Sequence, residues 1–467
     1  MPTSSAKHAL LLTSLALAFL AVGSVHAGEA RGIVEPAQPV TVMTRNIYVG
    51  ADIFRVVTAD PIIIVPTIAE VYATVVATNF AERAQVLADE VALYQPQLIG
   101  LQEVALIRRQ SPGDVFLGNP VPASEIDMDF LQMYLDALAE RGLNYVVAVS
   151  VENADIELPL LTDSSLDDIR LTDRDVILVR SDVVVHDTQT ANYTDNVIIN
   201  LSGAIINFNR GYTAATVGID GRDYRFVNTH LEVGSQPQVQ GDQAAELIDW
   251  LSSETLPLIL VGDFNASPQD PPIQAYARLI DAGFEDIWEN RSIDDNDPGL
   301  TCCFSETLDD AEPNFGERID ILFVRNLPNT ALESVEATVI GANAGMQTAS
   351  GLWPSDHAGV VSTFRLLGPG DDGDGDGVVD GLDNCVEAVN PAQRDTDGDG
   401  FGNFCDSDFN QDGIVNFLDL RYFRLNFGSA DPDADLNGDG NVNAADLGLV
   451  RLAFFLPPGP SGVVLVP

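Results

Sequence analysis

Apolar and polar positions follow two alternating periodicities between residues 35 and 367. Short apolar runs typical of buried strands lie at 40–47, 97–102, 145–151, 174–180, 212–217, 225–231, 258–265, 318–324 and 358–364. Runs with helical spacing separate them at 66–95, 129–141, 242–253 and 272–282. Because strands and helices alternate along the chain, we predict a layered α/β or α+β domain over residues 35–367.

The run LILVGDFN at 258–265 is the most informative of these strands. Its aliphatic residues lead directly into Asp263 and Asn265, so a doubly buried strand would deliver two polar side chains to one end of a sheet. A carboxylate can accept a proton, and a neighbouring carboxamide can orient a charged oxygen. The alternative is an Asx turn in which both side chains satisfy local backbone groups.

Other predicted strands end in the same way, which favours a functional site over an Asx turn. Residues 28–467 contain three histidines, His186, His230 and His357, and two of them fall in polar motifs at strand ends. We leave His186 as structural. The remaining polar residues at or beside strand ends are Asn46, Glu103, Asp320 and Asp356.

A different kind of sequence begins at residues 368–370. From residue 371 the chain consists largely of Asp, Asn and Gly, and two repeats at 408–427 and 435–454 read D-x-N-x-D-G-x-V-N-x-x-D before an apolar run. Such loops supply oxygen ligands to Ca²⁺ in the EF-hand manner, with glycine at the sixth position. The ligands would be Asp408, Asn410, Asp412, Asn416 and Asp419, then Asp435, Asn437, Asp439, Asn443 and Asp446.

The repeats at 407–456 resemble a type I dockerin, and residues 368–406 are similar to thrombospondin type 3 repeats. The first resemblance implies a cohesin-like protein partner, and the second implies Ca²⁺ ligands and a disulfide between Cys385 and Cys405. Because the segment is poor in apolar residues, it would need cations to fold, and the alternative is a disordered acidic spacer. The implied ligands in residues 368–406 are Asp372, Asp374, Asp376, Asp380, Asp383, Asp395, Asp397 and Asp399.

Residues 1–27 have the features of a signal peptide. Lys7 and His8 precede an apolar run from Leu10 to Val22, and Ala27 ends a small-residue cleavage pattern. A retained membrane anchor is the alternative, but this run, like every later one, is shorter than the roughly 20 residues that span a bilayer. We therefore predict a secreted protein, extracellular or periplasmic, with no transmembrane segment after cleavage.

The charge of the chain narrows the choice of partners. Seventy acidic residues against 23 basic ones give a formal net charge of −47, and the acidic excess is not confined to residues 371–446. Such a surface repels polyanions, so nucleic-acid binding through a generally basic face is excluded.

Residues 457–467 are a Pro/Gly tail.

The ordered motifs TRNI, LQEV, NTHL, GDFN, RID and SDH resemble the endonuclease/exonuclease/phosphatase superfamily over about residues 40–367. The resemblance implies an α+β fold in which two packed mixed β-sheets are flanked by helices, a four-layer α/β sandwich. It also implies Mg²⁺ or Mn²⁺ in the site and attack of water on phosphorus. Hard cations of this kind prefer oxygen ligands, which these motifs carry.

The resemblance assigns roles to the strand-end residues. Glu103 would be the main metal ligand beside Asn46, with Asp356 as a further or outer ligand. Taken alone, Glu103 could equally be a solvated residue, and Asp356 a helix N-cap. The proton-handling and charge-stabilising residues would be His230, Asp263, Asn265, Asp320 and His357.

Two further positions follow from alignment to the family pattern. Asp173 would orient His230, and Arg210 would bind phosphate through its planar donor fork. A surface turn for Asp173 and a surface ion pair for Arg210 are equally open.

Two segments depart from the better-known family members. The apolar insertion at 60–78 is a lid, a lipid-facing element or a helix packed against the core, and we favour the last. Cys302 and Cys303 are adjacent, so they form a vicinal disulfide or remain reduced.

The prediction is a secreted, metal-dependent phosphoric ester hydrolase with a calcium-binding C-terminal region. Its phosphodiester substrate is nucleic acid, a phospholipid headgroup or a small molecule. The alternative is a non-catalytic calcium-dependent adhesion or scaffold protein with a degenerate hydrolase domain.

Overall fold

The computed structural model describes residues 38–463, except 118–119, 202–203, 272, 294–295, 326–330, 344 and 368–370. The predicted signal peptide at 1–27 lies outside the described residues, as do residues 464–467 of the predicted tail. Among the described residues no single helix is long and apolar enough to cross a membrane, although the bent pair 64–77 and 80–94 passes that test by length and composition.

Two mixed β-sheets form the centre of the fold. The first sheet has the order β15 (Ala331–Ile340), β16 (Gly359–Leu367), β1 (Val40–Asn46), β2 (Leu98–Gln102), β6 (Leu166–Arg180), β3 (Leu106–Gln110) and β4 (Glu125–Asp129), with β5 (Tyr145–Leu161) paired to β6. The second has the order β13 (Glu285–Asp286), β14 (Asp320–Arg325), β12 (Leu258–Asp263), β11 (Arg222–His230), β10 (Gly211–Ile219) and β7 (Val184–Asn192). Strands β8 (Val197–Leu201) and β9 (Ala204–Phe208) form a separate hairpin.

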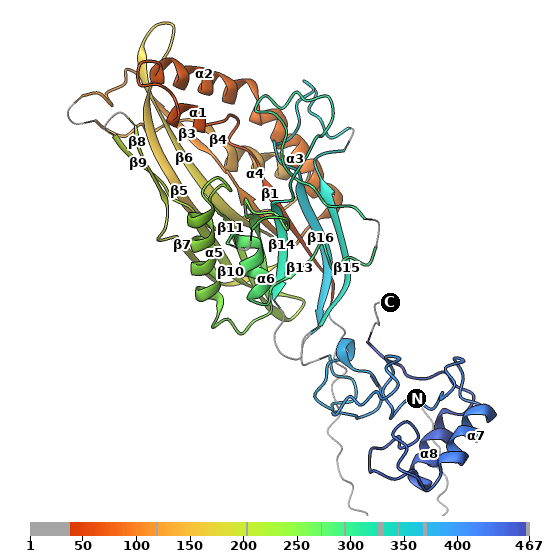
Figure 1. Cartoon of the computed structure of the whole chain (residues 1–467). Helices are drawn as coiled ribbons and strands as arrows, with labels where there is room; N and C mark the ends of the chain where they lie inside the picture. The colour runs from red at the N-terminus through yellow and green to blue at the C-terminus, as the bar shows by residue number, and fades with distance from the viewer. Residues whose placement is uncertain are drawn as a thin grey trace, which may run out of the picture. The chain divides into compact units, whose positions relative to one another are not determined.

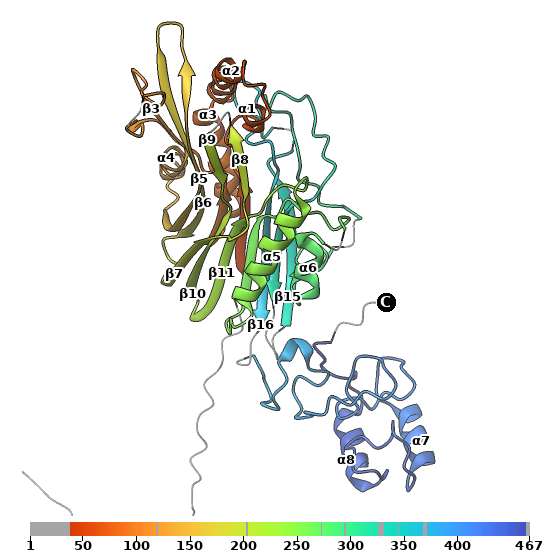
Figure 2. The same cartoon turned by 60° about the vertical axis from the view of Figure 1, so that its left-hand side comes forward.

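Helices cover the outer faces of both sheets (Figures 1 and 2). Side chains alternate across each strand, so Leu98 of β2 lies in the core between the sheets while Ile99 lies in the core under the helices. On the first sheet these helices are α1 (Phe54–Val57), α2 (Ile64–Ala77), α3 (Phe80–Tyr94) and α4 (Phe130–Glu140); on the second they are α5 (Pro237–Leu251) and α6 (Ala275–Asp281). The predicted four-layer sandwich is therefore confirmed.

The helical periodicity at 66–95 covers two helices rather than one. α2 ends at Ala77 and α3 begins at Phe80, because Asn79 between them has a left-handed backbone with φ of 42°. Ile68, Val71 and Val75 of α2 are buried against the first sheet. The apolar insertion is thus a helix packed against the core, as we favoured.

Several strands lack the alternating pattern that sequence reasoning depends on. β7 has no buried residue and carries a polar sequence, VVHDTQTAN, so its extended conformation comes from pairing with β10. β5 and β6 continue well beyond their apolar cores as a long hairpin with partly exposed charged residues. The pattern also gave no indication of β3, β4, β8, β9, β13 and β15.

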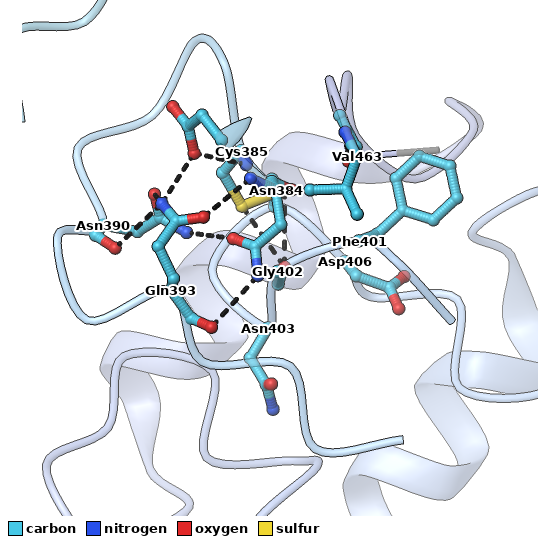
Figure 3. Close-up of a disulfide and its surroundings, with 12 residues drawn as sticks. Asn384, Cys385, Asn390, Gln393, Phe401, Gly402, Asn403, Asp406 and Val463 are labelled. Atoms are coloured by element: carbon cyan, nitrogen blue, oxygen red, sulfur yellow. Dashed lines mark hydrogen bonds between the residues drawn. A yellow bond between two sulfur atoms is a disulfide. The ribbon is translucent and has the colours of Figure 1, made fainter. Parts of the chain in front are cut away.

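The C-terminal segment from residue 371 contains a short helix η1 (Asp380–Leu382) and two longer helices, α7 (Phe417–Asn426) and α8 (Ala444–Ala453). Both longer helices begin with a capping box, Asn416 with Asp419 and Asn443 with Asp446. The predicted disulfide between Cys385 and Cys405 is present, and hydrogen bonds among Asn384, Asn390 and Gln393 surround it (Figure 3).

Candidate active site

The ends of neighbouring strands bring the predicted site residues together. In the first sheet β1 and β2 run parallel, and Asn46 pairs in register with Gln102, so Glu103 follows directly beside Asn46. In the second sheet His230 of β11 pairs with Asp263 of β12, which in turn pairs with Asp320 of β14. Strand register therefore brings residues from five separate motifs to the strand ends, two in the first sheet and three in the second.

Asn46 connects the two sheets. Its amide Nδ2 donates to Glu103 Oε1 at 3.1 Å and to Asp263 Oδ2 at 3.0 Å, while its Oδ1 accepts from the Tyr48 backbone N–H at 2.9 Å. Glu103 Oε2 accepts from the Val49 backbone N–H at 2.9 Å. Both predicted metal-binding residues are thus held in place by hydrogen bonds from the β1 end and the turn after it.

Three non-glycine residues of the site adopt left-handed backbone conformations. Tyr48, Glu103 and Asn265 have φ values of 58°, 57° and 49°. Such conformations cost of order 1–3 kcal/mol in non-glycine residues and cluster at functional sites. Here they turn the chain immediately after β1, β2 and β12, which directs the side chains into the same region.

Asp263 is buried at the centre of the cluster. Its Oδ1 accepts from the Asn265 backbone N–H at 2.9 Å, and its Oδ2 lies 3.5 Å from His230 Nε2 and 3.8 Å from His357 Nδ1. Burial, together with the carboxylate of Asp320, raises the pKa of Asp263 to about 7, although the imidazole of His357 acts in the opposite direction. A carboxylate in this state can take up a proton near neutral pH.

His357 is paired with Asp320. Its Nδ1 lies 2.8 Å from Asp320 Oδ2, which leaves Nε2 as the ring nitrogen free of this contact. Burial opposes the charged imidazole, but the carboxylates of Asp320, Asp263 and Asp356 outweigh it and raise the pKa of His357 well above its usual range. His357 is therefore a cation at neutral pH.

His230 has the opposite electrostatic environment. Its Nε2 lies 3.1 Å from Asn265 Nδ2, and its Nδ1 lies 3.0 Å from Arg210 Nη1. Burial and the charges of Arg210 and His357 lower the pKa of His230 well below its usual range, so the ring is neutral. Because an arginine can only donate, Nδ1 accepts from Arg210.

Arg210 lies between His230 and Asp173. Its Nη1 is 3.9 Å from Asp173 Oδ2 and 3.0 Å from His230 Nδ1, so Asp173 reaches His230 through Arg210. Burial and the nearby Glu103 carboxylate raise the pKa of Asp173 to about 6. Arg210 is thus a buried cation in an acidic region, which suits it to hold an anionic oxygen.

A cleft of about 340 Å³ opens on one side of this cluster. Glu103, Asp173, Arg210 and Asp356 line it. Burial raises the pKa of Asp356 to about 7, and Glu103 and Asp263 add to that effect. The lining of the cleft therefore combines several carboxylates with one positively charged group, the guanidinium of Arg210.

Sequence reasoning missed the buried residues that support the site. Arg45 donates to the backbone oxygen of His357 and forms an ion pair with Glu90 at 3.0 Å, and all of these groups are buried. Arg83 donates to the backbone oxygens of Ile47, Tyr48 and Pro354. The available signal was the position of Arg83 and Glu90 on the apolar face of α3, where charged residues need buried partners.

The structure joins Cys302 and Cys303 in a disulfide beside the site, which decides between the two states left open. Cys303 Sγ lies 3.8 Å from His357 Nε2. His186 lies apart from the cluster, where its Nε2 is 3.1 Å from Asp223 Oδ1, in keeping with a structural role.

The predicted calcium ligands gather in short loops. Carboxylate oxygens of Asp372, Asp374 and Asp376 lie within 4.8 Å of one another, and so do those of Asp395, Asp397 and Asp399. In the two repeats, Asp408 accepts from the backbone N–H of Asp412 and Gly413, and Asp435 accepts from Asp439 and Gly440. Asp419 and Asp446 close the loops by accepting from Asn410 and Asn437. Asp380 and Asp383 instead accept from the backbone of Gly373 and Cys385.

Comparison with solved structures shows several similar chains, whereas no curated protein matches. TDP2 from D. rerio, humanized by mutation, has 17% sequence identity and a TM-score of 0.41, with 70% of this chain and 99% of that one covered. An endonuclease/exonuclease/phosphatase family protein from Leptotrichia buccalis has 16% identity, a TM-score of 0.45, and coverage of 70% and 99%. A mannosyl-6-phosphatase from Bacteroides thetaiotaomicron has 17% identity, a TM-score of 0.42, and coverage of 70% and 99%.

The model of the Endonuclease/Exonuclease/phosphatase family matches residues 77–357 of the 467-residue chain. This match covers more than half of the chain. It contains Glu103, Arg210, His230, Asp263 and His357, whereas β1 with Asn46 and the turn after β1 precede it. The chain therefore belongs to the endonuclease/exonuclease/phosphatase family and is a phosphoesterase of that family.

Proposed function

We propose that the protein is an exported phosphodiesterase that uses Mg²⁺ or Mn²⁺ to hydrolyse a phosphodiester. The observation that carries this proposal is the cluster at the strand ends. In it the Oδ2 atom of the buried Asp263 lies 3.5 Å from the neutral His230 and 3.8 Å from the cationic His357. Hydrolysis of a phosphate ester needs a proton acceptor for water and positive charge for the phosphoryl oxygens. This cluster supplies both.

The residues at the cleft fit a hard divalent cation, as is usual in this family. Glu103 and Asp356, which line the cleft, would hold it through their carboxylate oxygens, and Asn46 would contribute its Oδ1 while its Nδ2 donates to Glu103. The electrostatics of Asp356 support this choice, because burial first and then the carboxylates of Glu103 and Asp263 raise its pKa, and a cation would relieve that repulsion. When bound, the cation supplies polarisation of the phosphoryl oxygen and of water.

The chain's own residues divide the remaining work. Asp263 takes the proton of the attacking water, because its raised pKa matches neutral pH. His357, held by Asp320, presents a positive charge to the phosphoryl oxygens. Arg210 and the Asn265 amide bind the same oxygens, while His230 orients Asn265.

The test is a substrate panel of DNA, sphingomyelin and an aryl phosphodiester, each assayed with Ca²⁺ alone and with Ca²⁺ plus Mg²⁺. We expect Mg²⁺-dependent turnover of at least one substrate, and we expect His357→Ala to abolish it while the variant still folds and unfolds cooperatively. If the variant retains turnover, the assigned roles are wrong. If neither protein turns over any substrate, the non-catalytic adhesion or scaffold alternative replaces this proposal.

Within this proposal the charge of the chain disfavours duplex DNA as the substrate. A formal net charge of −47 repels a polyanion, and this repulsion is strongest at low salt. A phospholipid headgroup or a small phosphodiester carries far less charge. We therefore expect the panel to rank the aryl diester and sphingomyelin above DNA.

We further propose that residues 368–406 and 407–456 bind Ca²⁺ and that the second segment docks onto a cohesin-like partner. Support comes from the clustered carboxylates and from exposed apolar side chains on or beside α7 and α8, namely Phe417, Leu425, Phe427, Leu452 and Phe455. Exposed patches of this kind mark protein interaction sites. Calorimetric titration with a cohesin domain should give binding in Ca²⁺ and none in EGTA, and equal heats in both buffers would refute it.

A further inference from the structure

An apolar cavity of about 90 Å³ lies under α1 and α2. Its walls come from these two helices and from strands β3, β5, β6 and β9, which surround it with aliphatic and aromatic side chains. Tyr72 carries the one hydroxyl in this lining, and that hydroxyl donates to Asp127 Oδ2 at 2.8 Å. Because a cavity lined in this way offers no partners to water, an apolar ligand would fill it better.

The cavity adjoins the cleft of the active site, because three residues contribute to the lining of both. Val49, Ile53 and Leu171 line both. The Val49 side chain lies against the cavity, while its backbone N–H donates to Glu103 Oε2 at 2.9 Å. The same residue therefore borders the carboxylate that we assign to the metal and the hydrocarbon wall.

Strand β6 shows how the sequence joins the two environments. Ile169, Leu171 and Asp173 lie on one face of the strand, because side chains two residues apart point the same way. The first two line the cavity, and Leu171 and Asp173 line the cleft. The change from apolar to acidic thus occurs within about 7 Å along one strand.

The cavity also depends on residues outside the segment that matches the family. The match begins at residue 77, whereas α1 and most of α2 precede it. Ile68, Val71 and Val75 of α2 supply one wall, and Val56 of α1 supplies another. The apolar insertion is therefore the element that closes the cavity.

We propose that the cavity receives the hydrocarbon chain of the substrate while the phosphate lies in the adjoining cleft. The substrate is then a phosphodiester with an alkyl or acyl chain, which deepens and rests on the proposed phosphodiesterase function. Each methylene that enters the cavity is expected to improve kcat/KM by up to about fourfold, because burying one methylene is worth about 0.8 kcal/mol. A nucleotide chain has no part that would use these walls.

The first experiment measures a series of 4-nitrophenyl alkyl phosphates from methyl to octyl with Mg²⁺ and Ca²⁺. Water bonds to phosphorus and gives a proton to Asp263, the bond from phosphorus to the aryl oxygen breaks, nitrophenolate leaves with the electron pair, and the alkyl phosphate remains. We expect kcat/KM to rise with chain length until the cavity is filled and then to level off. A flat series would overturn the inference while leaving the proposed function intact.

Variants locate the effect. Val71→Phe places an aromatic ring in the cavity. Val76→Phe is the matched control, because it makes the same change on the exposed face of α2, where Val76 is 53% exposed. The ratio of kcat/KM for octyl and methyl esters should fall toward one in Val71→Phe and stay at the wild-type value in Val76→Phe. If Val71→Phe melts early, Ile68→Phe replaces it, and a retained ratio in a folded cavity variant would overturn the inference.

A binding measurement separates this inference from the proposed function. Calorimetric titration with methyl, butyl and octyl phosphate needs no turnover, so tighter binding with chain length supports the cavity even if no ester is hydrolysed. Equal affinities for all three overturn it. Monomeric dihexanoylphosphatidylcholine and dioleoylphosphatidylcholine vesicles then distinguish a free ester from a membrane lipid as the source of the chain. If the enzyme hydrolyses alkyl aryl esters but neither of these lipids, the substrate is a non-lipid alkyl ester.

Discussion

Replacing Asp320 by asparagine is expected to shift the alkaline limb of the pH–rate profile to lower pH. Asp320 Oδ2 lies 2.8 Å from His357 Nδ1, and both side chains are buried. The carboxylate favours the charged imidazole, so His357 keeps its proton until the pH rises through its raised pKa. Activity that depends on this charge is lost above that pH.

The size of the shift follows from the contact that is weakened. A hydrogen bond to a charged group contributes about 1.5–3 kcal/mol, and one pKa unit corresponds to about 1.4 kcal/mol. Asparagine keeps a neutral acceptor at the same place, and Asp263 at 3.8 Å still favours the cation. We therefore expect the pKa that governs the alkaline limb to fall by about 1–2 units.

The assay is kcat/KM for an aryl phosphodiester across the pH range, with Mg²⁺ and Ca²⁺ constant. On the alkaline side the loss should reach roughly 10- to 100-fold. The acid limb should also move to lower pH, because Asp320 no longer raises the pKa of Asp263. Asp249→Asn is a matched control, because Asp249 is exposed on α5 and lies apart from the cluster. An alkaline limb that stays in place in Asp320→Asn, or moves to higher pH, would show that His357 does not act as the cation.

Three further outcomes are expected. The acid limb of kcat/KM should lie near pH 7, because burial raises the pKa of Asp263 to about 7; a limb near pH 4 would exclude Asp263 as the proton acceptor. Chelation by EGTA should make residues 371–463 sensitive to protease while residues 38–367 stay resistant, since the loops carry repelling carboxylates; equal protection contradicts calcium binding. N-terminal sequencing of exported protein should begin at Gly28, and a start at Met1 contradicts the signal peptide.

Buried arginines explain why the site needs support beyond the residues that touch substrate. Arg45 joins β1 to the backbone of His357, and its own charge is balanced by Glu90 of α3. Arg83 of the same helix binds the backbone on both sides of the β1 turn. Removing one partner of such a buried pair costs about 3–5 kcal/mol, so α3 is coupled energetically to the position of the site.

The amino-acid sequence by itself determined where the polar groups occur along the chain. Apolar runs ending in Asn46, Glu103, His230 and Asp263 indicated strands that deliver functional groups, because strand periodicity is a local property. The Asp- and Asn-rich loops that we propose to bind calcium were equally visible, since their carboxylates and amides are spaced within a dozen residues. The alternation of predicted strands and helices was also sufficient to predict the layered fold.

Tertiary structure alone decided the charge states and the distances. His230 and His357 are the same residue type in similar motifs, yet one is neutral and the other cationic, because Arg210 lies beside the first and Asp320 beside the second. Pairing of β10 with β11 sets Gly211, the residue after Arg210, opposite His230, whereas His357 reaches Asp320 of β14 from the segment before β16. The cavity under α2 likewise needs strands and helices far apart in the chain. Burial and long-range pairing depend on the whole fold, so no local pattern of residues could specify them.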